Sequence, residues 1–174
     1  MMNSSTNDDC ESIVKALLDG DTKFKLLLES IGAVKEDEGR WKVKCRPCSR
    51  TGTEGKSRAF ITAHPSEIVL CSNRLPDRKN IEEALLHELV HAYDYSLARY
   101  DFYSCDGLAS TEVRAAREAE CSSRMLVFDW LRSRCIRSCA SRSTSHIYGE
   151  EAPECVKRVY DKAVLDKQPF KETS

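Results

Sequence analysis

Apolar side chains recur at helical intervals near the start of the chain. Between Ile13 and Ile31 they are Val14, Leu17, Leu18, Phe24, Leu27 and Leu28. Spacings of three and four residues place such side chains on one face of a helix. The pattern is interrupted at Gly20-Asp21, so it predicts two short helices rather than one long helix. The polar residues 1–10 are expected to form a disordered tail.

Three short segments that follow are typical of β-strands. Residues 41–45 alternate between apolar and polar side chains, as a half-buried strand does. Residues 60–63 and 67–71 are rich in β-forming side chains and flank a turn at residues 64–66, so they predict a hairpin. Two interpretations of segment 67–71 are open: an ordinary core strand, or an edge strand to which a peptide substrate adds through backbone hydrogen bonds.

The second half of the chain is predicted to be helical. Asn80 is a suitable N-cap for a helix over about residues 81–97. A second helix is expected to begin near Ser110 and to run toward Trp130. Residues 136–145 are rich in serine and arginine and are predicted to form a loop.

A last helix is predicted over residues 154–165, and Pro169 is expected to end it. Strands early in the chain and helices later favour an α+β fold. A length of 174 residues fits one domain. No apolar run is long enough to span a bilayer.

The helix predicted over residues 81–97 contains the sequence HELVH at residues 87–91, which is an H-E-x-x-H motif. Histidines four residues apart lie on the same face of a helix, so the imidazoles of His87 and His91 can bind one Zn²⁺. Glu88 follows the first of them, and its carboxylate can take a proton from a water on the metal. Two histidines at the edge of the core are the alternative. The motif favours an α+β, zincin-like metallopeptidase with a small β-sheet beside the helices that carry the site.

A catalytic zinc needs a third protein ligand and keeps one position open. The metzincin class is excluded, because Asp94 and Leu97 stand where that class has glycine and histidine. We expect Glu112 to be the third ligand, since the alanines that follow it let the next helix pack closely. The alternative for Glu112 is an acid in the first turn of a helix, beside the dipole. Four other side chains compete as ligands: His64, Asp106, Glu118 and Glu120.

Asp94 lies three residues after His91, on the side of the helix that faces the predicted metal. It can accept a hydrogen bond from a ligand imidazole and so orient it. A solvated acid on the helix surface is the alternative interpretation.

Three segments carry a family resemblance: HELVHAYD at residues 87–94, TEVRAA at residues 111–116 and IVLCSN at residues 68–73. Together they resemble the mitochondrial inner-membrane metalloproteases that serve ATP synthase assembly. The resemblance covers about residues 40–165. It implies a zinc-dependent endopeptidase of the intermembrane space that is attached peripherally to the inner membrane. It also implies two roles: processing the precursor of an ATP synthase membrane subunit, and chaperone-like help in assembling the membrane sector.

In this family reading His87 and His91 bind zinc and Glu88 is the catalytic acid and base, whereas the ligand role of Glu112 remains our own inference. We interpret residues 1–174 as a single metallopeptidase domain. Its parts would be the tail at residues 1–10, a catalytic core at about 40–130 and a C-terminal helical region at 131–174.

Cysteine is unusually frequent, and no secretory signal or mitochondrial presequence is evident. The nine cysteines are at positions 10, 45, 48, 71, 105, 121, 135, 139 and 155. The resemblance implies that oxidation in the intermembrane space pairs most of them and leaves one over. Cys45 and Cys48 can instead form half of a structural zinc site. Cys135 and Cys139 lie one helical turn apart and can bridge to other helices, with Cys155 as one candidate partner.

The charges nearly cancel, because 27 Lys and Arg residues against 28 Asp and Glu residues give a net charge of −1. Such a balance argues against a nucleic-acid partner, and so against a zinc protease linked to DNA repair. The other rival function is a non-proteolytic assembly chaperone or scaffold. One stretch is basic, and its arginines are Arg124, Arg132, Arg134, Arg137 and Arg142. It can rest on anionic lipid head groups, or it can be an ordinary solvated face.

Overall fold

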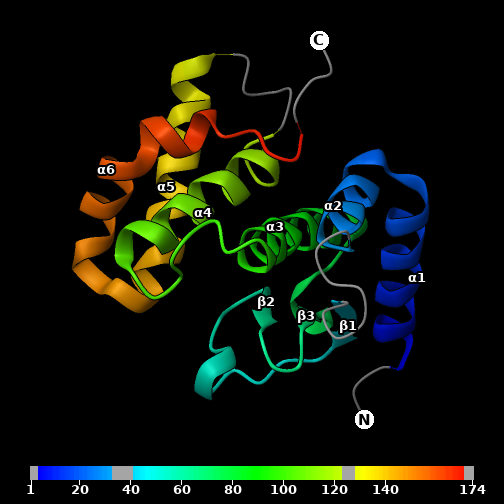
Figure 1. Cartoon of the computed structure of the whole chain (residues 1–174). Helices are drawn as coiled ribbons and strands as arrows, with labels where there is room; N and C mark the ends of the chain where they lie inside the picture. Colours follow the sequence, from blue (N-terminus) through cyan, green and yellow to red (C-terminus); the bar gives the residue numbers. More distant parts are fainter. Residues whose placement is uncertain (1–3, 33–40, 123–127, 171–174) are drawn as a thin grey trace. The chain divides into compact units, whose positions relative to one another are not determined.

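The computed structural model describes residues 4–32, 41–122 and 128–170, and it confirms a mixed α+β fold (Figure 1). The chain divides into two compact units, residues 1–92 and 93–174, and the boundary falls inside helix α3. The first unit contains α1 (Ser4–Gly20), α2 (Thr22–Gly32), β1 (Lys42–Arg46), η1 (Gly52–Glu54), β2 (Ala59–Thr62), β3 (Glu67–Cys71), η2 (Ser72–Arg74) and most of α3 (Arg78–Ser96). The second unit contains the end of α3, α4 (Cys105–Glu118), α5 (Asp129–Tyr148), η3 (Gly149–Glu151) and α6 (Ala152–Leu165).

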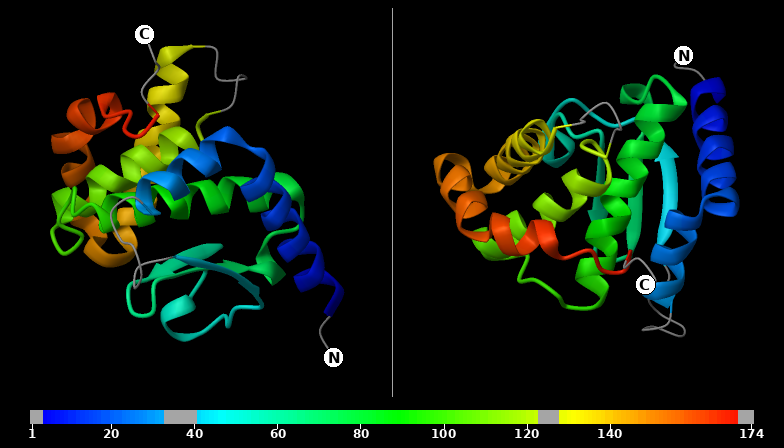
Figure 2. Two further views of the ribbon diagram at one scale, coloured as in Figure 1. Left: turned by 45° about the vertical axis from the view of Figure 1, so that its right-hand side comes forward. Right: turned by 90° about the horizontal axis from the view of Figure 1, so that it is seen from above.

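The two predicted N-terminal helices are confirmed, with the break at the expected place. The side chain of Asp21 accepts a hydrogen bond from the backbone N–H of Lys23 at 2.7 Å, which is how an N-cap residue starts a new helix. The predicted disordered tail is wrong for residues 4–10, because α1 already begins at Ser4. A disulfide from Cys10 to Cys45 ties this helix to β1, beside which α1 runs in Figure 2.

The sheet has the strand order β1-β3-β2, so β3 is its central strand. Strand β3 pairs antiparallel with β2, as the predicted hairpin requires, and parallel with β1. The edge-strand interpretation of residues 67–71 is therefore wrong, since both edges of β3 are already hydrogen-bonded within the sheet. Residues 68–71 are buried, as the core-strand interpretation expects.

Helix α3 begins at Arg78, three residues before the predicted start at 81. The residue that caps it is Asp77 rather than Asn80. A carboxylate oxygen of Asp77 accepts the backbone N–H of Asn80 at 2.9 Å. Hydrogen bonds from Asn80 hold the pKa of the Asp77 carboxyl below its usual value.

Helix α4 begins at Cys105, five residues before the predicted start near Ser110. Its N-cap is Ser104, whose hydroxyl accepts the backbone N–H of Gly107 at 3.0 Å. Only glycine fits at 107, because an added Cβ would lie 1.9 Å from the carbonyl oxygen of Asp101. The helix ends at Glu118, so the predicted run toward Trp130 is wrong.

The predicted loop over residues 136–145 is also wrong, since this segment forms the middle of α5. Ile136, Ala140 and Thr144 follow one another at intervals of four and are all buried. Ile136 and Ala140 pack into the apolar cluster shared with α4 and α6. Figure 1 shows α5 beside these two helices. One narrow apolar stripe is enough to bury a helix whose serine and arginine side chains occupy the other faces. The last helix is confirmed as α6, and it ends at Leu165, before Pro169.

Eight of the nine cysteines form disulfides, as the family resemblance implied. The pairs are Cys10–Cys45, Cys48–Cys71, Cys105–Cys155 and Cys121–Cys135. The second zinc site at Cys45 and Cys48 is therefore excluded, because their sulfurs are used in these bonds. Cys135 bonds Cys121, which lies in the turn after α4 and not in another helix as expected, while Cys139 keeps its thiol and Cys155 pairs with Cys105.

We expect the disulfides to contribute strongly to stability, and reduction to lower the melting temperature. Loop closure predicts about 4 kcal/mol for Cys105–Cys155, which are 50 residues apart, and about 3 kcal/mol for Cys121–Cys135, which are 14 apart. Alkylation of native protein followed by mass spectrometry should add at most one adduct, at Cys139, against nine after reduction and unfolding. Nine adducts on protein taken directly from its own cells would contradict this pairing.

Candidate metal centre

Helix α3 places the two motif histidines on one face, as predicted. The Nε2 atoms of His87 and His91 lie 3.0 Å apart, and the rings meet edge to face with centroids separated by 4.7 Å. Two imidazole ligands of a tetrahedral zinc, each about 2.0–2.1 Å from the metal, have nitrogens about 3.3 Å apart. The observed separation differs from this value by a few tenths of an ångström, so the pair fits one metal ion with only a small side-chain adjustment.

Most of the motif is buried. Leu85 and Leu89, at the same helical spacing as the histidines, are fully buried on another face of α3. Glu88 and His91 are buried as well, with 7% and 6% of their surfaces exposed. A carboxylate and an imidazole held out of bulk water interact more strongly with a charge than they would at the surface. The sequence alone located these residues, but it gave no indication of their burial.

Glu112 lies in the interior of α4 rather than at its start. It is the eighth of the fourteen residues of that helix, and 8% of its surface is exposed. The alternative interpretation, an acid in the first helical turn beside the dipole, is therefore wrong. The first-turn acid of α4 is Asp106.

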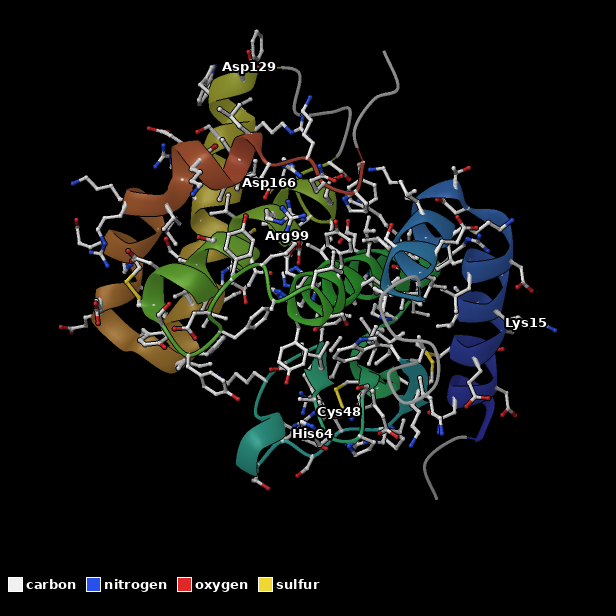
Figure 3. All side chains as sticks on the ribbon, in the orientation of Figure 1. Lys15, Cys48, His64, Arg99, Asp129 and Asp166 are labelled. Atoms are coloured by element: carbon white, nitrogen blue, oxygen red, sulfur yellow. A yellow bond between two sulfur atoms is a disulfide. The ribbon has the colours of Figure 1, made fainter. Side chains whose placement is uncertain are left out.

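Three of the competing ligand candidates are bonded to arginines or exposed to solvent. Asp106 forms a bidentate ion pair with Arg158, with the shortest contact at 2.6 Å. Glu118 accepts a hydrogen bond from Nε of its neighbour Arg117 at 2.7 Å. His64 is exposed in the turn between β2 and β3 (Figure 3). Glu120, the fourth candidate, follows the end of α4.

Asp94 is completely buried, so the interpretation as a solvated acid is wrong. One of its carboxylate oxygens, Oδ2, accepts hydrogen bonds from Thr111 Oγ1 at 2.8 Å and from Arg114 Nε at 2.9 Å. Its other oxygen lies 3.5 Å from Arg99 Nε. Burial raises the pKa of Asp94, and the charge and hydrogen bond of Arg114 act in the opposite direction.

A second acid extends this group to the segment that follows α6. Asp166 accepts hydrogen bonds from Arg99 and from the hydroxyl of Tyr100, the latter at 2.7 Å, and Figure 3 shows Arg99 beside it. Burial acts to raise the pKa of Asp166, but the hydrogen bond from Tyr100 and the charge of Arg114 hold it below its usual value. Burial and the Asp166 carboxylate raise the pKa of Tyr100 to about 12. The sequence carries no signal that Asp166 joins Asp94 in one cluster, because the two acids lie far apart along the chain.

A model of the Peptidase M76 family matches residues 8–171. The mitochondrial inner membrane protease ATP23 homolog of Xenopus laevis is 30% identical over 180 residues, which are 95% of this chain and 74% of the relative. The homolog of Danio rerio is 32% identical, with 92% of this chain and 66% of the relative covered. The mitochondrial inner membrane protease ATP23 of Pyricularia oryzae is 34% identical, with 75% and 54% covered.

No solved structure matches the chain. None of the described helices is both long and apolar enough to cross a bilayer. The family match spans nearly the whole sequence and includes the H-E-x-x-H motif on α3. It confirms the resemblance to mitochondrial inner-membrane metalloproteases. The chain therefore belongs to the Peptidase M76 family, and it is a metallopeptidase of the H-E-x-x-H type that acts on protein substrates.

Proposed function

We propose that this chain is a zinc-dependent endopeptidase of the mitochondrial intermembrane space. It works at the surface of the inner membrane, cleaves the precursor of an ATP synthase membrane subunit and aids assembly of that enzyme. The observation that carries the proposal is the pair of facing Nε2 atoms on α3, in a chain whose relatives are named mitochondrial inner membrane proteases. The whole chain, residues 1–174, acts as one peptidase domain with its catalytic core at about 40–130.

The proposed ligands are His87, His91 and Glu112, a candidate metal-binding group of two imidazole nitrogens and one carboxylate oxygen. This donor set, with one open position, is that of a catalytic zinc rather than a structural one. The contacts of the neighbouring residue support Glu112. Thr111 donates a hydrogen bond to Asp94, and Asp94 follows His91 by three residues on the same helix.

A zinc ion held by these ligands supplies Lewis-acid polarisation of the scissile carbonyl and of water. Glu88 accepts a proton from the attacking water and delivers it to the leaving amine, so one carboxylate acts first as base and then as acid. Burial of Glu88 suits this role. A carboxylate shielded from bulk water passes its proton to the reacting groups rather than losing it to solvent.

Two further observations support the location. Four disulfides are typical of a protein in an oxidising compartment. A location in the intermembrane space, where cysteines are oxidised, accounts for them. Arg132, Arg134 and Arg142 are exposed on α5, where they can meet anionic head groups. Arg137 instead lies over the ring of Tyr160, 3.5 Å from its centroid, and Arg124 is outside the described residues.

Replacing Glu112 by glutamine should weaken zinc binding, because it removes the negative charge of a ligand while keeping its size. The loss of affinity should exceed the roughly 10- to 100-fold that the loss of an outer-shell partner costs. Competition with a chromogenic chelator measures the zinc dissociation constant. Glu118→Gln and Asp106→Asn are the matched controls and should bind zinc as the wild type does. Normal affinity in Glu112→Gln, together with a loss in either control, would show that Glu112 is the wrong ligand.

The proposed activity is tested with purified protein and the precursor of the ATP synthase membrane subunit. Cleavage should occur, stop after removal of the metal by a chelator and return when zinc is added. A precursor that stays intact with zinc-loaded protein would overturn the peptidase assignment for this substrate.

A further inference from the structure

We propose that Arg114 is a positioning residue for the metal centre, and that it fixes helix α4 by joining Asp94 to the segment 166–168 beyond α6. The inference rests on the proposed roles of His87, His91 and Glu112. It concerns residues outside the H-E-x-x-H motif, and it makes the metal centre depend on a segment more than seventy residues away along the chain.

Arg114 uses all three guanidinium nitrogens, although only 1% of its surface is exposed. Its Nε donates to Asp94 Oδ2 at 2.9 Å. The two terminal nitrogens donate to the backbone carbonyl oxygens of Asp166 and Gln168, and one of them lies 3.0 Å from the carboxylate of Asp166. A planar guanidinium bonded at three points has one orientation, so Arg114 sets the spacing between these partners.

The position of Arg114 on α4 links these bonds to the proposed ligand. Thr111 and Arg114 flank Glu112 in the sequence, and both donate to the same oxygen of Asp94. Asp94 belongs to the last turn of α3 and follows His91 by three residues. Rotation of α4, or a slide along its axis, would break both bonds to Asp94. The two bonds from Thr111 and Arg114 therefore fix the axial position of Glu112 on α4 relative to the last turn of α3.

The far side of Arg114 is anchored as well. Asp166 is held by Arg99 and Tyr100 in addition to Arg114, so the segment after α6 is bonded from several directions. The charges balance within this cluster: Asp94 and Asp166 face Arg99 and Arg114. Arg114 consequently cannot move away from Asp94 without also giving up its bonds to segment 166–168.

Metal ligands must be held to within about 0.5 Å for full affinity and activity, so a loosened support is measurable at the metal. Lysine at position 114 would keep the charge and most of the length. Its ammonium is a single point, however, and cannot reach Asp94 and both carbonyl oxygens together. We expect Arg114→Lys to raise the zinc dissociation constant by about 10- to 100-fold, as loss of an outer-shell partner does.

Arg117→Lys is the matched control. Arg117 is also a buried arginine of α4, and it also bonds to the C-terminal part of the chain, through the carbonyl oxygen of Val164 at 2.7 Å. It also donates to Glu118, and within the described residues Asp94 is bonded by Thr111 and Arg114 rather than by Arg117. The control should lower the melting temperature of the metal-free protein and leave the zinc dissociation constant unchanged.

The experiment measures, for each full-length variant, the zinc dissociation constant by chelator competition and the melting temperature without metal. Asp166→Asn is a milder third variant, since its side chain is 22% exposed, and it should raise the dissociation constant in the same direction even if Arg114→Lys does not fold. Equal effects of Arg114→Lys and Arg117→Lys on zinc affinity, or wild-type affinity in both Arg114→Lys and Asp166→Asn, would overturn the inference. If the His87→Ala variant binds zinc as tightly as the wild type does, the proposed function is overturned instead.

Discussion

Glu88→Gln should abolish peptide cleavage and leave the metal in place. Glutamine has the size of glutamate and can still form hydrogen bonds, but it cannot accept the proton that the attacking water must lose. General acid–base groups contribute about 10²- to 10⁴-fold to rate, and Glu88 is proposed to act in both steps, so cleavage should fall at least this far. The imidazoles of His87 and His91 are unchanged, so the zinc content should equal that of the wild type.

The measurement combines precursor cleavage with ATP synthase assembly in the same cells. Glu82→Gln, on the same helix but outside the motif, is the control and should behave as the wild type. If the chain also assists assembly by binding, uncleaved precursor should accumulate in Glu88→Gln cells while assembly proceeds. Wild-type cleavage in this variant would refute the role of Glu88, and loss of assembly together with cleavage would contradict a separate chaperone-like role.

The second large effect is expected from the histidines. His87→Ala or His91→Ala should remove the metal. Each variant keeps only one of the two imidazole ligands, together with the carboxylate of Glu112, and a catalytic zinc needs three protein ligands. Cleavage should disappear with the metal. The wild type should contain about one zinc per chain, measured by elemental mass spectrometry on protein freed of loosely bound metal.

His64→Ala is the matched control for this experiment, since His64 is exposed in a turn between strands. It should retain zinc, activity and the zinc-dependent increase in melting temperature that follows when a ligand binds only the folded state. Full zinc occupancy in His87→Ala would contradict the assignment of the site.

The chemistry of the site could be predicted from local sequence because the motif lies within one helix. The spacing of His87 and His91 determines that both face the same side, whatever the rest of the chain does. The ligand proposed on α4 is a different kind of inference, since it depends on the packing of another helix. The sequence placed Glu112 at a helix start, and the structure places it in the third turn.

The errors in the fold have physical causes. Residues 136–145 carry little apolar surface, so their helix is visible only as the stripe of Ile136, Ala140 and Thr144. The polar start of α1 looked like a tail, because the constraint on it is a disulfide whose partner lies 35 residues away. Strand β3 is central through a parallel pairing with β1, and no short-range pattern indicates such a pairing.

The cluster around Asp94 also depends on contacts between residues that are distant in the sequence. Arg114 and Asp166 read as ordinary charged residues in the sequence, and both lie within helix patterns or at their ends. Their importance comes from burial and from contacts across 20 to 54 residues of chain. The rule that a buried charge must be paired explains the cluster once the fold is known, but it does not predict which partners meet.

Diffraction from zinc-loaded crystals, recorded on both sides of the zinc absorption edge, tests the central claim most directly. We expect one anomalous peak per chain, within about 2.0–2.2 Å of Nε2 of His87, of Nε2 of His91 and of a carboxylate oxygen of Glu112, with a fourth position open to solvent. A peak bonded to other side chains, or no peak between the two histidines, would contradict the account.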